Sequence, residues 1–131
     1  MASDIDFRAR RILDVIAMIE DYRLDIRTVT MGISLIGCAR ATMSATAEAV
    51  YDRVTERAAR LVEVCEGIER ELGIPIVNKR ISVSPISLVA AELDGNPADI
   101  AASLDRAAAA LGVNFVGGYS SLVEKGMTES D

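Results

Sequence analysis

Residues 25–35 read DIRTVTMGISL and residues 74–85 read IPIVNKRISVSP, and these two stretches decide the fold. In both, apolar and polar residues alternate, which is the period of an extended strand whose two faces differ. We therefore expect strands over residues 24–35 and 74–84. Pro75 fits at the start of the second strand, where its missing amide hydrogen does no harm, and Pro85 ends it.

Helical spacing of apolar residues fills the chain around these strands. The spacing predicts helices over residues 7–20, 43–72, 86–93, 97–111 and 120–125, and a short third strand over residues 113–116. Thr42 or Ser44 would cap the longest helix, and Asn96 the one after Pro97. Gly73 and Gly112 each follow the last apolar residue of a helix and precede a strand, as left-handed helix stops do.

The resulting order of helices and strands predicts an α/β fold with a largely parallel βαβαβ sheet and flanking helices. The chain has 131 residues, which fits one domain, and half of them are hydrophobic. Aromatic residues make up 4%, so the core is expected to be aliphatic.

Charge and cysteine content limit the partners and the location. The net charge is −6, which gives no electrostatic reason to bind nucleic acid or an anionic membrane. No apolar stretch approaches the roughly 20 residues of a membrane span. The chain holds two cysteines, Cys38 and Cys65, and its first residues are polar and acidic. A reducing cytoplasm is the expected location.

The residue types present restrict the chemistry. Histidine is absent, which removes the commonest general base and the commonest zinc ligand, and two scattered cysteines do not make a metal site. No metal is expected, and no motif specifies a cofactor. Cys38 lies near Arg40 and is either an activated thiol or a small buried hydrophobe. Cys65 falls on an apolar helix stripe and is expected in the core.

The candidate site is a polar face on the two long strands. One face of the first strand and one face of the second carry only polar or small residues, which are Thr28, Thr30, Gly32, Ser34, Asn78, Arg80, Ser82 and Ser84. A parallel sheet normally hides both faces and is apolar throughout. We predict the wall of a ligand pocket in which Arg80 holds a small anion. A solvated face, or one covered by protein outside this chain, is the alternative.

Two further features belong to this hypothesis. Lys79 is a second candidate for binding the anion, although alternation places it opposite Arg80, and an ion pair with Asp25 or Glu92 is its structural alternative. Gly117 and Gly118 follow the third strand, where their amides would cradle a phosphate or carboxylate. A tight turn explains the two glycines equally simply, and their spacing is neither that of a P-loop nor that of a dinucleotide fingerprint.

Four stretches resemble one prokaryotic family. Residues 25–35, LGIPIVNKR at 72–80, SVSPIS at 82–87 and FVGGYS at 115–120 are similar, in order and separation, to the amino-terminal region of the domain of unknown function 711 family, also called uncharacterised protein family 0210. The resemblance covers nearly the whole chain. It implies proteins several-fold longer, whose fold is like the α/β barrel of formate-lyase-like glycyl radical enzymes. Residues 1–131 are then a single unit, the amino-terminal fragment of a larger α/β domain and part of such a barrel.

The resemblance carries no reaction, so three functions stay open. The first is a partial domain without independent catalysis, whose polar face becomes a pocket wall once the remainder of a longer chain is added. The second is an enzyme acting on a small anionic metabolite bound by Arg80, Lys79 and Asn78. The third is a self-associating module, a homo-oligomer whose copies cover one another's sheets.

Overall fold

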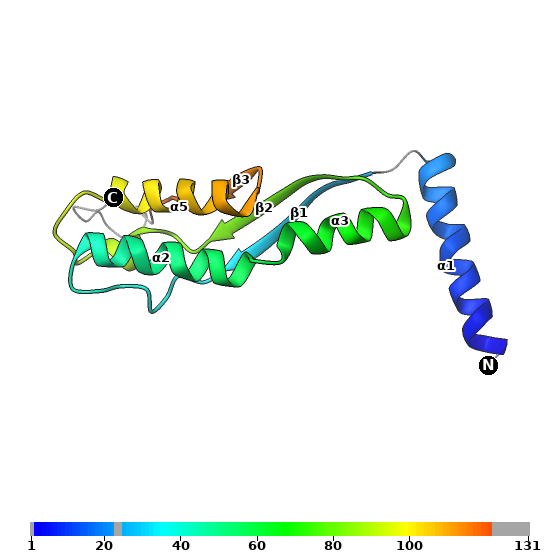
Figure 1. Cartoon of the computed structure of the whole chain (residues 1–131), viewed down its shortest axis with the longest axis horizontal. Helices are drawn as coiled ribbons and strands as arrows, with labels where there is room; N and C mark the ends of the chain where they lie inside the picture. Colours follow the sequence, from blue (N-terminus) through cyan, green and yellow to red (C-terminus); the bar gives the residue numbers. More distant parts are fainter. Residues whose placement is uncertain (1, 23–24, 122–131) are drawn as a thin grey trace.

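The computed structural model describes residues 2–22 and 25–121 (Figure 1). In chain order its elements are α1 (Ala2–Glu20), β1 (Ile26–Ile33), α2 (Met43–Ala58), α3 (Leu61–Leu72), β2 (Ile76–Val83), α4 (Ser87–Ala90), α5 (Ala98–Leu111) and β3 (Phe115–Gly117). Residues 118–121 are irregular, and the rest of the helix expected over 120–125 lies outside the described residues. The predicted alternation of helices and strands is confirmed.

The three strands form one sheet in the order β1-β2-β3, and both pairs are parallel. This confirms the α/β fold with a parallel sheet and flanking helices. β2 is the central strand, so the side chains on each of its faces lie between those of β1 and β3. The sheet described here is open, and closure into a formate-lyase-like barrel remains what the resemblance implies.

The single long helix predicted over residues 43–72 is wrong, because the structure has two helices that meet at Ala59 and Arg60. No proline or glycine marks the break. α2 packs against α5 and β1, whereas α3 packs against β2, so the change of direction lets each helix follow its own partner. The start of α2 is as predicted, since the Thr42 hydroxyl accepts a hydrogen bond from the Ala45 amide at 3.2 Å.

The glycine stops are confirmed. Gly73 and Gly112 end α3 and α5 with φ of 68° and 69°, in the left-handed region that side chains disfavour. The Asn96 side-chain oxygen accepts a hydrogen bond from the Ala98 amide at 3.0 Å, but the N-cap position of α5 is Pro97, so the cap predicted at Asn96 is one residue too early. The helix expected over residues 86–93 is shorter than predicted and is confined to α4.

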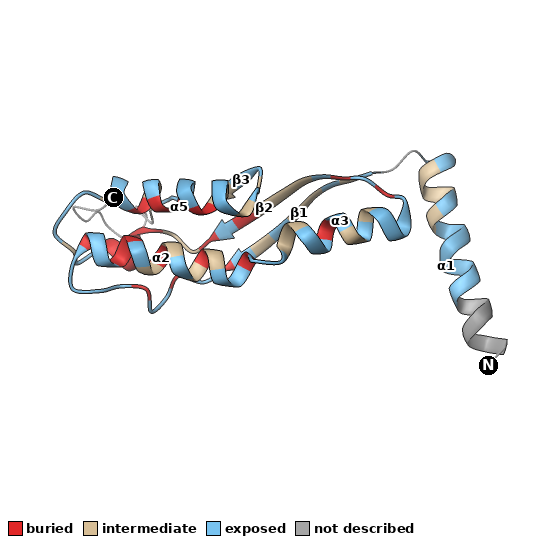
Figure 2. Ribbon diagram, in the orientation of Figure 1, coloured by how far each residue is buried: buried red, intermediate tan, exposed pale blue. Residues whose placement is uncertain are grey.

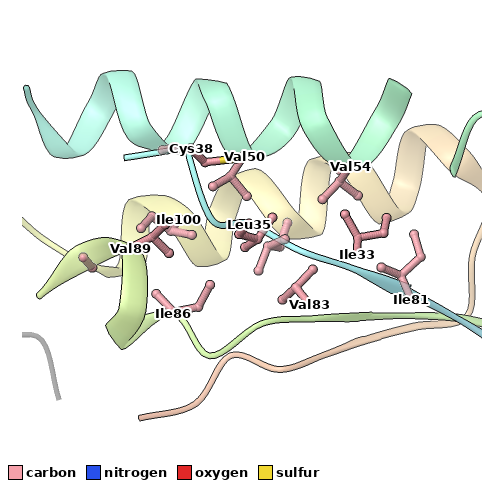
Figure 3. Close-up of a cluster of buried hydrophobic side chains, with 14 of the residues drawn as sticks. Ile33, Leu35, Cys38, Val50, Val54, Ile81, Val83, Ile86, Val89 and Ile100 are labelled. Atoms are coloured by element: carbon pink, nitrogen blue, oxygen red, sulfur yellow. The ribbon is translucent and has the colours of Figure 1, made fainter. Parts of the chain in front are cut away.

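The core is aliphatic, as the composition predicts. It lies where α2 and α5 pack against each other and against the inward side chains of β1 and β2 (Figures 2 and 3). Its largest fully buried members include Leu35, Val50, Val54, Ile81 and Ile100. α1, in contrast, extends away from the sheet, and its side chains from residue 8 onward are exposed or half-buried (Figure 2).

Candidate functional site

The register of β1 and β2 brings the two polar tracks side by side. Partners in the parallel ladder are Thr28 with Asn78, Thr30 with Arg80, and Gly32 with Ser82. Directly paired residues of neighbouring strands point to the same face of a sheet. The predicted alignment of the two hydrophilic sides is therefore confirmed. Thr30, Gly32 and Ser82 are exposed, while Ile81 and Val83 on the other face are buried in the core.

The amino-terminal end of β2 departs from this alternation. Ile76 is buried, and Val77, which the alternation places on the same face as Ile81, is 49% exposed. The buried residues thus change sides between Val77 and Ile81. The polar face that lies open to solvent is confined to the middle and the carboxyl ends of the strands.

β3 adds an aromatic ring to this face. Phe115 is the ladder partner of Arg80, and Gly117 is the partner of Ser82. The Arg80 guanidinium carbon lies 5.6 Å from the centre of the Phe115 ring, within the range of a cation–π contact. Phe115 itself is 56% exposed. Arg80 is thus flanked by Thr30 on one side and by Phe115 on the other.

The Arg80 side chain is only partly satisfied. Its Nε atom is buried and has no hydrogen-bond partner among the described residues. A buried donor without a partner is rare in folded proteins and costs more free energy when it carries charge. The other guanidinium nitrogens also have no hydrogen bond or ion pair within the described residues, so the cation is neutralised by no carboxylate of this region.

Several polar residues of the predicted site have structural contacts. The side-chain amide of Asn78 donates a hydrogen bond to the Arg27 carbonyl oxygen at 3.0 Å. The Ser84 hydroxyl accepts from the Leu35 amide at 2.9 Å, which ties the ends of β1 and β2 together. The Ser34 hydroxyl accepts from the Ile36 amide at 3.3 Å. These bonds hold the strand ends in place and leave Arg80, Thr30 and Ser82 as the outward-facing groups.

Lys79 lies on the other face of β2 and does not join Arg80. Its ammonium is 3.1 Å from the Glu69 carboxylate of α3 and 3.0 Å from the Ile76 carbonyl oxygen, and it is largely buried. The suggested pairs with Asp25 or Glu92 are wrong, since Asp25 lies beside Arg27 at 3.8 Å instead. The spacing of Glu69 and Lys79 carries no sequence signal for their pairing, because they meet only through the packing of α3 on β2.

The Glu69 carboxylate fastens α3 to the start of β2. It accepts a hydrogen bond from the Ile76 amide at 2.6 Å in addition to the one from Lys79. The hydrogen bond from the Ile76 amide has the larger effect and the one from the Lys79 ammonium the next, and both hold the pKa of Glu69 below its ordinary value of 4.5. Both donors favour the ionised form.

Packing explains Gly118, which directly follows β3. Gly118 has a φ of 100° and lies directly against the Val83 backbone, so an added Cβ would overlap the Val83 carbonyl oxygen. A side chain at this position is excluded by space as well as by conformation. This contact accounts for Gly118 without an anion, and the cradle predicted for Gly117 and Gly118 stays a prediction.

The remaining chemical groups are in the core. Cys38 and Cys65 are free thiols, 1% and 3% exposed. Across residues 2–22 and 25–121, no three cysteine, aspartate or glutamate side chains gather as metal ligands would. Within the same residues, each helix is too short or too polar to pass through a bilayer.

Comparison with known proteins identifies a family and several similar proteins. Residues 17–131 match the family described as "Uncharacterised ACR (DUF711)". A UPF0210 protein of Corynebacterium glutamicum is 72% identical over 126 residues, which is 96% of this chain and 27% of that protein. UPF0210 proteins of Desulforamulus reducens and Streptococcus mutans are 52% and 48% identical, over 95% and 93% of this chain and 28% of theirs.

The chain therefore spans a little over a quarter of the length of these curated relatives. The matched residues include both long strands, the polar face and the glycine pair. The resemblance noted in the sequence is thus confirmed, and the chain belongs to the DUF711 family, a family described as uncharacterised.

Proposed function

We propose that this chain is the amino-terminal part of a larger cytoplasmic α/β domain, and that its polar sheet face is one wall of a pocket for a small anionic ligand. The remaining polypeptide supplies the other walls, and the chain alone catalyses no reaction. Arg80 binds the anion, and Thr30 and Ser82 supply hydroxyls beside it. Thr28, Asn78, Ser34 and Ser84 shape the wall through their place in the strands.

The observation that carries this proposal is the state of Arg80. Its Nε is buried and has no hydrogen-bond partner in residues 2–22 and 25–121, while its guanidinium is held against Phe115. The ring fixes the plane of a group that forms paired hydrogen bonds with carboxylate or phosphate oxygens. An anion in this position would add charge-assisted bonds to a guanidinium that the described residues leave underused.

The open sheet supports a larger domain. β1 and β3 are edge strands within the described residues, and exposed edges invite pairing with further strands. Relatives that contain this region are more than three times longer, which gives ample chain to cover the polar face. Closing the sheet into a barrel, as in formate-lyase-like enzymes, would remove both edges at once.

A chimera tests the proposal. This chain replaces the matching quarter of the Corynebacterium glutamicum relative, and native mass spectrometry of the chimera and of the chain alone looks for a retained small molecule. We expect an anion on the chimera and only weak binding to the chain alone. Arg80→Ala should abolish retention, whereas Arg27→Ala, a control on the exposed partner of Asp25, should preserve it. A chimera without a bound anion, or one unaffected by Arg80→Ala, contradicts the proposal.

The same chimera separates the enzyme hypothesis from simple binding. If the retained molecule is chemically changed after incubation and the change requires Arg80, the protein is an enzyme acting on a small anionic metabolite, and the non-catalytic role is wrong. If the molecule is returned intact, the binding role stands. Lys79 is not expected to contribute in either case, because Glu69 holds it on the opposite face.

Self-association is a second candidate, favoured by exposed apolar side chains. Ile12, Leu13 and Ile16 on α1, and Val64 and Leu72 on α3, are large hydrophobic residues that lie on the surface. Clusters of this kind mark contact surfaces in many proteins. Sedimentation velocity over a wide range of concentrations tests it. A species that stays monomeric at every concentration excludes this role.

A further inference from the structure

A second cationic hollow lies on the edge of the sheet, away from Arg80. It is a cavity of about 310 Å³ between α2 and the end of β1, lined by Met31, Gly32, Ile33, Ser34, Arg53 and Arg57. The lining contains two guanidinium groups and no carboxylate. The volume falls within the range of roughly 300–1,000 Å³ in which small ligands bind.

The two arginines come from one face of α2. Arg53 and Arg57 are four positions apart, so their side chains lie one helical turn above each other. Like charges at this spacing repel, and an anion between them would relieve the repulsion. The whole chain carries a charge of −6, so this positive lining is a local arrangement against the overall balance.

Neither guanidinium is neutralised within the described residues. Arg53 donates one hydrogen bond, to the Ser34 carbonyl oxygen at 3.3 Å, which directs it to the end of β1. The Arg57 side chain has no hydrogen bond or ion pair with any of residues 2–22 and 25–121. Other arginines of this region lie beside a carboxylate, namely Arg27, Arg60, Arg70 and Arg106.

The position of the hollow also suits a ligand. It opens at the carboxyl end of a parallel strand, which is where ligands of open α/β sheets bind. Ser34 is exposed there, and its hydroxyl hydrogen is free to donate, because the oxygen accepts its bond from the Ile36 amide. A dianionic group would thus meet two guanidiniums and one hydroxyl.

We propose that this hollow binds a small molecule carrying a phosphate group or a pair of carboxylates, held by Arg53 and Arg57. The site is independent of the pocket proposed around Arg80. Arg80 belongs to the central strand β2, whereas this hollow lies at the outer edge of β1 and takes both of its guanidinium groups from α2, although Gly32 and Ser34 belong to the polar face as well.

Amide chemical shifts of the full chain test the proposal. Inorganic phosphate and malonate are titrated separately, and we expect the amides of Gly32 and Ser34 to shift with at least one of them. Shifts with phosphate alone indicate that the ligand is a phosphate ester, and shifts with malonate alone indicate a dicarboxylate. Shifts with both probes indicate that the site recognises the dianionic charge that the two share. Shifts confined to Ser82 and Gly117, or no shift with either probe, overturn the proposal.

Three variants then identify the side chains responsible. Arg57→Gln removes charge-assisted bonds and should weaken binding by about tenfold or more. Arg57→Lys keeps the charge but not the fork of donors, so its affinity should lie between those of Arg57→Gln and the parent. Arg60→Gln, on the neighbouring turn and paired with Glu63, is the matched control and should bind as the parent does. Equal losses in Arg57→Gln and Arg60→Gln would mean a nonspecific charge effect and would refute the site.

Discussion

Replacing Gly118 by alanine tests whether the chain after β3 lies against the end of β2. A methyl group at this position would overlap the Val83 carbonyl oxygen, and it would lie 2.9 Å and 3.0 Å from the Val83 carbonyl carbon and amide nitrogen. These contacts are with backbone atoms, which cannot rotate away as a side chain can. The substitution must therefore displace either residue 118 or the end of the central strand.

The cost has two parts, which a second glycine separates. Alanine in the left-handed region costs about 1–2 kcal/mol, and crowding a well-packed site adds about 1–3 kcal/mol. Gly37 has a φ of 86°, and an added Cβ there meets nothing within 4 Å. Gly37→Ala should therefore lose only the conformational part, about 1–2 kcal/mol, whereas Gly118→Ala should lose about 2–5 kcal/mol.

Urea unfolding followed by far-UV circular dichroism measures both losses. Comparable slopes in the two variants would show that the unfolded state is unchanged, so the midpoints can be compared directly. The difference between the variants is the free energy of the contact with Val83. If both lose the same amount, or if Gly118→Ala loses less, the close approach of residue 118 to β2 is wrong.

Three further predictions use the same unfolding assay. Leu35→Ala should lower the free energy of unfolding by about 2–5 kcal/mol, because Leu35 is 0% exposed. Leu61→Ala should cost less, since Leu61 is only partly buried, and equal costs would contradict the proposed core. Thr42→Ala should cost about 1 kcal/mol through loss of the α2 cap, and a value near zero would deny that bond a role. The pKa of Glu69 is lowered in the folded state, chiefly by the Ile76 amide, so its stabilising contribution is complete above pH 4.5 and is lost as the pH falls through the lowered folded-state value. Glu69→Gln should therefore reduce stability at neutral pH and flatten its decline below pH 4.5, and an unchanged acid profile would refute the assignment.

The parallel sheet and the sets of side chains that share each of its faces were accessible from the sequence, because alternation and helix stops are short-range patterns. Alternation in residues 25–35 and 74–85 specifies which side chains share a face, and Gly73 and Gly112 mark where helices stop. The hydrophilic sides of the two strands were therefore expected on one face, whereas the residue-by-residue pairing comes from the structure. The aliphatic core followed from the composition, in which aromatic residues make up only 4%.

Features set by packing between distant segments were not accessible. The break at Ala59 and Arg60 has no local cause, since helical propensity continues through it, and only the separate partners of α2 and α3 explain it. The contact between Arg80 and Phe115 depends on how far β3 is shifted along β2. The sequence pattern does not determine that shift, because β3 is only three residues long and carries no alternation.

Arg80, more than the hydroxyl groups, distinguishes the polar sheet face from an ordinary solvated one. Solvent alone would explain the exposed hydroxyls of Thr30 and Ser82, since water satisfies hydroxyl groups well. It does not explain Arg80, whose Nε is removed from solvent with no protein acceptor in the described residues. Burying part of a guanidinium is unfavourable unless another interaction compensates. The ring of Phe115 compensates in part, and in the proposed pocket a bound anion would add charge-assisted bonds to the same guanidinium. The curated relatives are more than three times longer than this chain, and in the proposed domain their additional residues would cover this face, so a ligand held between the two parts would account for the charge and for the open sheet together.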